Sequence, residues 1–183
     1  MRAVPIALAL VVSPFSLVAQ HFGTAENLAP YIPTPQILVE KMLESGHVKP
    51  GDLVYDLGSG DGRIVITAAQ KFGARAVGVE IRADLCRIAT EKIKSLGLED
   101  RVRMVQGNAL HVDLSPADVV TMYLLTSSNE LMKPNLEKYL KTGARVVSNE
   151  FPIKGWRPVE TVRMTTGSSM QHTIYVYEIG RTK

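Results

Sequence analysis

A glycine-rich loop and two later polar residues stand where three successive apolar segments end, and together they could hold a small ligand. The loop contains Asp56, Gly58, Ser59, Gly60, Asp61 and Gly62. Glu80 closes the second apolar segment, and Asn108 follows the third. Because glycine has no β-carbon, such a loop can turn sharply and approach a ligand closely. We therefore expect these residues to form one binding site.

Two common nucleotide sites do not match this loop. A phosphate-binding P-loop requires a lysine after its glycines, and none is present here. A dinucleotide-binding loop requires a small residue at its sixth position, where this chain has Arg63. Asp56 would also repel a pyrophosphate. The loop therefore excludes a nucleoside triphosphatase and weighs against a dinucleotide-dependent oxidoreductase.

The same residues suit S-adenosylmethionine. Asp56 is suited to the α-amino group and the sulfonium of that cofactor, which are both cationic. Glu80, at the end of a second strand, can accept hydrogen bonds from both ribose hydroxyls, and Asn108 can bond the adenine edge. The sequence thus predicts methyl transfer, with a dinucleotide-dependent oxidoreductase or a plain buried turn as the alternatives.

Short apolar segments alternate with amphipathic ones around these residues. We expect strands over 53–55, 76–79, 102–105, 119–125 and 144–147, and helices over 35–45, 64–72, 85–96 and 129–140. Residues 159–164 and 173–179 alternate like a hairpin with a long loop. This order predicts an α/β fold, a Rossmann-like, doubly wound seven-stranded sheet that is mostly parallel with a C-terminal antiparallel hairpin. In such a sheet the ligand lies at the carboxyl ends of the strands.

The first twenty residues differ from the rest of the 183-residue chain. Arg2 precedes an apolar stretch over 3–19 that ends in Leu-Val-Ala, an order typical of a secretory signal peptide. An uncleaved membrane anchor is the alternative. We therefore divide the chain into a signal-peptide-like or anchor segment over 1–19, a linker over 20–29 and a single domain over 30–183.

Composition argues against a disulfide framework, a metal site and a nucleic-acid partner. A single cysteine rules out an internal disulfide and a Cys-based metal cluster, and the four histidines show no ligand spacing, so we expect no metal. The net charge of +3 is too small to indicate a nucleic-acid partner.

Several segments resemble class I S-adenosylmethionine-dependent methyltransferases. The glycine loop, Gly-Val-Glu80, Gln-Gly-Asn108 and the closing hairpin carry that resemblance. Tyr-Ile-Pro-Thr-Pro over 31–35 and Arg-Val-Val-Ser-Asn-Glu-Phe over 145–151 are similar to a narrower group. That group contains the archaeal broad-specificity protein-lysine methyltransferase and the mitochondrial enzymes that methylate lysines of the ATP synthase c-subunit and the adenine nucleotide translocase. One departure is Asn149, where this group leads us to expect histidine.

The resemblance implies that Tyr31 and Thr34 lie over the bound cofactor and that the acceptor is the ε-amino group of a protein lysine. A lysine ammonium must lose a proton before it attacks the methyl carbon, because its free pKa is about 10.4. A carboxylate at the pocket mouth can orient the amine and help this step. From the strand ends we expect Glu150 to be that carboxylate and Tyr123 to be a wall of the acceptor site and a hydrogen-bond acceptor.

Other acceptors and functions stay open at this point. A small-molecule or RNA methyltransferase would share the cofactor site, and a catalytically silent module would bind cofactor without turnover. The chain has no [DN]-P-P-[YF] motif after the fourth strand and no basic cluster with interleaved aromatics, so we expect a protein substrate and no specific nucleic acid. The apolar stretch over 3–19 suggests export or membrane association, whereas cofactor supply argues for the cytoplasmic side.

Overall fold

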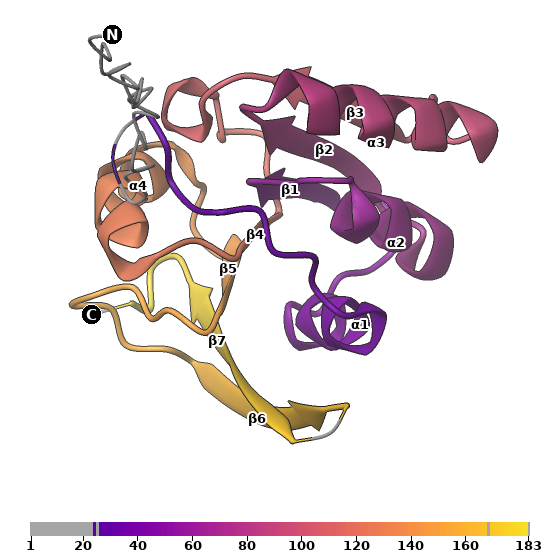
Figure 1. The fold of residues 1–183 in the computed structure, drawn as a ribbon. Helices are drawn as coiled ribbons and strands as arrows, with labels where there is room; N and C mark the ends of the chain where they lie inside the picture. Colours follow the sequence, from indigo (N-terminus) through magenta and orange to yellow (C-terminus); the bar gives the residue numbers. More distant parts are fainter. Residues whose placement is uncertain (1–23, 25, 168, 183) are drawn as a thin grey trace, which may run out of the picture.

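The computed structural model describes residues 24, 26–167 and 169–182, and Figure 1 shows the arrangement of their elements. Within these residues seven strands form one sheet in the order β3-β2-β1-β4-β5-β7-β6. The first five run parallel and are β1 (Leu53–Leu57), β2 (Arg75–Glu80), β3 (Val102–Gln106), β4 (Val119–Met122) and β5 (Arg145–Asn149). β7 (Met170–Glu178) is antiparallel to both of its neighbours, β5 and β6 (Glu160–Thr166). The predicted fold class is confirmed.

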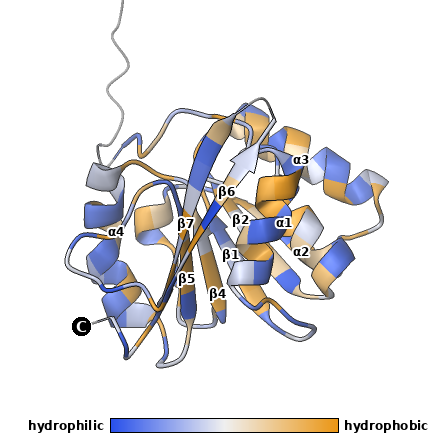
Figure 2. Cartoon of the chain, turned by 90° about the horizontal axis from the view of Figure 1, so that it is seen from below, coloured by the Kyte–Doolittle hydropathy of each residue, from blue (hydrophilic) through white to orange (hydrophobic). Residues whose placement is uncertain are grey.

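Helices cover both faces of this sheet. The helices α1 (Gln36–Ser45), α2 (Arg63–Phe72) and α3 (Ala83–Ser95) lie to the right of the sheet in Figure 1, and α4 (Thr126–Tyr139) lies to its left. Apolar residues of α1 and α2 pack with one face of the central strands, and Met132 and Leu136 of α4 pack with the other. Figure 2 shows hydrophobic colouring along the central strands and mostly hydrophilic colouring on α4. The two cores hold the strand ends in fixed positions, as the site requires.

The strand order reverses beside β1. From β1 the chain goes outward through β2 to β3, and it then returns to place β4 on the other side of β1. At this reversal the connections leave β1 and β4 in opposite directions, which opens a crevice at their carboxyl ends. The glycine loop begins there, directly after Leu57.

Several element boundaries differ from the sequence prediction by a few residues, and those of α1, α4 and β4 are among them. α1 begins at Gln36, and Pro35 takes the capping position without a side-chain hydrogen bond. α4 begins at Thr126 rather than at 129, and it is continuous through Pro134, with Met132 and Leu136 on either side buried in the core. β4 ends at Met122, so that residues 123–125 leave the sheet and line the crevice.

The hairpin arms are longer, and the loop between them shorter, than predicted. β6 and β7 stay paired as far as Thr166 and Met170. The hydropathy pattern does not show the alternation of buried and exposed positions here, because the buried positions at this end of the hairpin hold the polar residues Thr166 and His172.

No helix in the described part of the chain is long and apolar enough to cross a membrane. The segment predicted as a signal peptide or anchor, residues 1–19, lies outside the residues that the structure describes.

Candidate active site

A cavity of about 700 Å³ opens at the carboxyl ends of the central strands. The predicted cofactor residues that line it are Tyr31, Thr34, Asp56, Gly58, Ser59, Gly60, Asp61, Glu80 and Asn108. Gly62 is not among the lining residues; it takes the left-handed conformation at the start of α2. Residues 26–29, which the sequence places in the linker, line the cavity as well. A cavity of this size matches a small-molecule site.

Asp56 is the most deeply buried carboxylate of the cavity. It lies within β1, opposite Thr121 of β4, whose Oγ1 donates a hydrogen bond of 2.8 Å to Asp56 Oδ1. Burial, helped by the negative charges of Glu80 and Asp61, raises the pKa of Asp56 to about 6, although the bond from Thr121 lowers it. A cation bound beside this carboxylate would relieve the cost of its burial.

The glycine loop allows close packing at two points. Gly60 has a φ of +56°, and a β-carbon there would lie 2.6 Å from Cε2 of the Tyr31 ring. Gly58 has a φ of +79°, and a β-carbon there would lie 3.1 Å from Cδ2 of Leu124. Side chains at these positions would therefore displace residues of the cavity wall.

Glu80 holds the loop from the end of β2. Its Oε2 accepts a hydrogen bond of 2.7 Å from the Gly60 N–H, and its Oε1 accepts one of 2.9 Å from the Arg82 N–H. Each carboxylate oxygen has a second lone pair, so Glu80 can still accept hydroxyl donors from a ligand. Asn108 lies at the cavity wall, and its Oδ1 accepts a hydrogen bond from the Leu110 N–H at the start of a short 3₁₀ helix, η1 (Ala109–His111).

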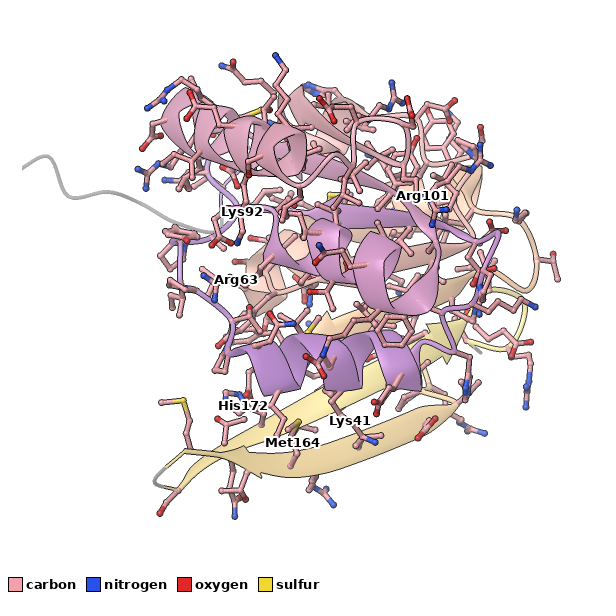
Figure 3. All side chains as sticks on the ribbon, turned by 90° about the vertical axis from the view of Figure 1, so that its right-hand side faces the viewer. Lys41, Arg63, Lys92, Arg101, Met164 and His172 are labelled. Carbon is pink, nitrogen blue, oxygen red and sulfur yellow. The ribbon has the colours of Figure 1, made fainter. Side chains whose placement is uncertain are left out.

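Arg63 fastens the segment 26–34, which forms one side of the cavity. Its guanidinium makes two hydrogen bonds of 2.7 and 2.8 Å with the Asp61 carboxylate, and a third of 2.7 Å with the Thr34 carbonyl. Burial alone would raise the pKa of Asp61, but the contacts with Arg63 lower it. At its other end the segment is held by the Ser128 hydroxyl, which donates to the Leu28 carbonyl. Figure 3 shows Arg63 beside this segment.

The side of the cavity at the ends of β4 and β5 is aromatic. Tyr123 and Phe151 both line it, and their ring centroids lie 6.3 Å apart. Burial, together with the charge of Glu150, raises the pKa of Tyr123. The phenol therefore stays protonated near neutral pH, so it lines the cavity and is available to hydrogen-bond but is not suited to act as a base.

Glu150 is close to this wall but is not itself a lining residue. It follows β5 with a φ of +63°, and its Oε1 lies 2.5 Å from Nδ1 of His172 on β7. Sequence reasoning named Glu150 as a candidate but did not predict its contact with His172. Asn149, which stands where the resembling methyltransferase group leads us to expect histidine, is fully buried. Neither polar atom of its side chain has a hydrogen-bond partner among the described residues.

Two further residues of the site were missed as contributors. Arg63 was noticed only as a mismatch with dinucleotide-binding loops, although a cation directly after an acidic loop is a signal for a structural ion pair. Phe151 stands next to Glu150, and its position after a strand was the available signal.

The lining residues fit S-adenosylmethionine. Asp56 could hold its cationic amino-acid part with a buried negative charge, Glu80 could accept from its ribose hydroxyls, and Asn108, at the cavity wall, could bond its adenine. The closeness of Tyr31 to the glycine loop leaves no room for a β-carbon at Gly60, as expected for a tightly built ligand cradle.

Comparisons with known proteins agree with this geometry. Residues 56–160 match the family model of the ANTKMT methyltransferase domain. A protein-lysine N-methyltransferase of Saccharolobus islandicus (strain REY15A) is 52% identical over 155 residues, which are 84% of this chain and 96% of the relative. An adenine nucleotide translocase lysine N-methyltransferase of Mus musculus is 35% identical over 133 residues, which are 73% of this chain and 58% of the relative.

A solved structure is similar over much of the same length. It is that of an RNA methyltransferase from Salinibacter ruber in complex with S-adenosyl-L-homocysteine. Its TM-score is 0.76 at 44% sequence identity, and the match covers 81% of this chain and 94% of that chain.

Proposed function

The chain belongs to the ANTKMT methyltransferase family, and from that premise we propose that its site transfers a methyl group to the ε-amino group of protein lysines. It is an S-adenosylmethionine-dependent enzyme with the class I fold. When bound, the cofactor supplies an electrophilic methyl carbon on a sulfonium. We assign its binding to Tyr31, Asp56, Glu80 and Asn108, together with the glycine loop.

One observation carries the choice of acceptor. The Glu150 carboxylate follows β5 next to Phe151, and its charge acts on Tyr123, which forms the aromatic wall of the cavity with Phe151. An ammonium group is attracted both by a carboxylate and by the faces of aromatic rings, whereas the amino groups of nucleic-acid bases carry no positive charge. This combination supports a lysine side chain as the acceptor, in agreement with the relative that is 52% identical.

The residues of this site then have distinct tasks. Glu150 orients the amine and favours removal of its proton, while Tyr123 and Phe151 exclude water from the reacting atoms. Arg63 keeps the segment 26–34 in place over the cofactor. Since methyl transfer disperses charge in the transition state, alignment of the amine contributes most to the rate.

The experiment identifies the methyl acceptor. The full chain is incubated with methyl-labelled S-adenosylmethionine and cell extract, and portions are then treated with protease or nuclease. We expect protease-sensitive label that yields methyl-lysine on hydrolysis. Glu150→Gln should lower this labelling strongly and leave cofactor binding in place. If labelling and binding are both unchanged in Glu150→Gln, the role assigned to Glu150 is wrong.

RNA is the second candidate, because a similar solved structure is that of an RNA methyltransferase. Label that is sensitive to nuclease and resistant to protease would move the assignment there. Cofactor binding without any label would favour a small-molecule acceptor or a silent module.

We further propose that residues 3–19 attach the enzyme to a membrane on the side where its cofactor is available. The apolar composition of the stretch supports this, as does the requirement of the domain for S-adenosylmethionine. Cells that express the full chain, or a chain starting at residue 20, are fractionated. Full-length protein found only in the soluble fraction would contradict the proposal.

A further inference from the structure

A polar side chain occupies a core position near the start of α4. Asn129 is fully buried, and it precedes Met132 and Leu136 at the spacing of one helix face. Because Met132 and Leu136 pack in the core, an apolar residue is expected at position 129 as well. Asn129 Oδ1 also has no hydrogen-bond partner among the described residues. A buried acceptor without a partner costs stability, so packing alone does not account for an asparagine here.

The other polar atom of Asn129 holds the backbone at the far end of the cavity wall. Its Nδ2 donates a hydrogen bond of 2.8 Å to the Phe151 carbonyl and one of 3.3 Å to the Ser148 hydroxyl. The Ser148 hydroxyl, which is fully buried on β5, donates a bond of 2.6 Å to the same carbonyl. The Phe151 carbonyl is therefore held by two donors, one from α4 and one from β5.

This carbonyl belongs to the turn 149–151, which carries Glu150 and the Phe151 ring. Glu150 has a φ of +63°, which is unfavourable for a residue with a β-carbon. Such a conformation persists where the surrounding structure restrains it. The Phe151 N–H donates a bond of 2.8 Å to the Asn149 carbonyl, so both backbone polar groups of Phe151 are engaged. These bonds fix the direction in which the Phe151 ring leaves the backbone and lines the cavity.

The residue before Asn129 holds a different wall of the same cavity. Ser128 is fully buried, and its hydroxyl donates to the Leu28 carbonyl. Leu28 lines the cavity and belongs to the segment 26–34, which runs from beside α4 to the start of α1 (Figure 1). Two neighbouring side chains of one helix thus fasten two walls that are far apart in the sequence.

We propose that Asn129 is a positioning residue for the methyl acceptor, because it holds the turn 149–151 that presents Phe151 and Glu150. Ser128 holds the cofactor side of the cavity. The role toward the acceptor rests on the proposed lysine methylation, whereas the effect of Asn129 on Phe151 does not. Since the rate depends on alignment of the reacting groups, a displacement of about 1 Å can cost about 100-fold.

The first test observes Phe151 directly in the full chain. The protein is labelled with 4-fluorophenylalanine, and the fluorine NMR signal of Phe151 is identified by its loss in Phe151→Leu. Asn129→Leu suits the apolar face of α4 and removes the donor together with the partnerless oxygen. We expect it to shift or broaden the Phe151 signal, and an unchanged signal would overturn the proposal. Asn135→Leu is the matched control, because Asn135 lies on the same helix and donates a bond of 2.6 Å to the Leu110 carbonyl. It should leave the Phe151 signal in place.

The second test separates the two walls by their effects on the two ligands. Initial rates of methyl-lysine formation are measured with increasing amounts of heat-treated bacterial cell extract and saturating methyl-labelled S-adenosylmethionine. Asn129→Leu should lower the rate at limiting extract by up to about 100-fold, while calorimetry shows wild-type cofactor affinity. Ser128→Ala should weaken cofactor affinity and leave the Phe151 signal in place. A merely structural disturbance of α4 would change both properties in both variants, and that result would overturn the proposal.

Ser148→Ala provides a further check, because it removes the other donor to the Phe151 carbonyl. Each single variant leaves this carbonyl one partner, and the double variant with Asn129→Leu leaves it none. The loss of rate in the double variant should therefore exceed the product of the single losses, and a loss equal to that product would contradict the shared restraint. If Asn129→Leu does not fold, Ser148→Ala should still shift the Phe151 signal, and an unchanged signal would refute the restraint. Wild-type protein that labels only nucleic acid removes the proposed function, whereas the fluorine signal still decides the role of Asn129.

Discussion

Replacing Asp56 by asparagine should stabilise the ligand-free enzyme at neutral pH while weakening its hold on the cofactor. The pKa of Asp56 is raised from 3.8 to about 6 by burial. A raised folded-state pKa contributes stability that is fully present below the unfolded value and is lost as the pH rises through the folded value. At 1.36 kcal/mol per pKa unit, the loss between pH 3 and pH 7.5 is roughly 3 kcal/mol. Asp56→Asn keeps the shape of the side chain and removes this loss.

Urea unfolding of the ligand-free protein between pH 3 and pH 7.5 measures the effect. The difference in unfolding free energy between Asp56→Asn and wild type should move in favour of the variant by roughly 3 kcal/mol as the pH rises. Because the comparison is made across pH, any fixed change in packing cancels. Asp100→Asn, at an exposed aspartate, serves as the control and should show no such trend.

Cofactor binding gives an independent check on the same carboxylate. If binding of the cationic ligand requires ionised Asp56, wild-type affinity should be about tenfold weaker at pH 5 than at pH 7.5. Asp56→Asn should bind weakly at both pH values. A wild-type cofactor affinity that does not change with pH would refute the reasoning. So would a difference in unfolding free energy between Asp56→Asn and wild type that is the same at pH 7.5 as at pH 3.

Substitutions at three positions, Gly60, Arg63 and Glu150, test the surroundings of the cavity. Gly60→Ala and Gly97→Ala both place a β-carbon at a positive φ, so each should lose about 1 kcal/mol of stability. Only at Gly60 does the β-carbon meet the Tyr31 ring. Calorimetry should therefore show weaker cofactor binding for Gly60→Ala and not for Gly97→Ala. Arg63→Met removes the bonds that fasten the segment 26–34, so chymotrypsin should cut after Tyr31 faster than in wild type, and an unchanged cutting rate would contradict the fastening. Glu150→Gly and Glu150→Ala lose the same side-chain contacts, but glycine accepts the positive φ, so thermal unfolding should show the glycine variant about 1 kcal/mol more stable.

The gathering of the glycine loop and Glu80 around one cavity could be read from the sequence because its signals are local. Asp56, the glycines and Glu80 lie at the ends of short apolar runs, and parallel strands bring such ends to one edge of a sheet. Topology alone was therefore sufficient to predict that these residues share one cavity.

The acceptor half was only partly predictable because it depends on pairing between distant strands. Glu150 stands at a strand end and was identified, but its contact with His172 exists only because β7 lies antiparallel to β5. In the sequence His172 falls among polar residues that are typical of a loop. The role of Arg63 was also hidden, since its bond to the Thr34 carbonyl joins segments 29 positions apart.

The place of β7 in the sheet has a consequence for the order in which the enzyme assembles during synthesis. β7 follows the other strands in the sequence, yet it inserts between β5 and β6. The strands that carry Asp56 and Glu80 leave the ribosome early and can pair at once, since chains fold from the N-terminal side as they emerge. β6 has no neighbour until β7 arrives, and with β7 comes His172. A nascent chain can thus build the glycine-loop side of its cavity well before β7 arrives to anchor the turn at Glu150.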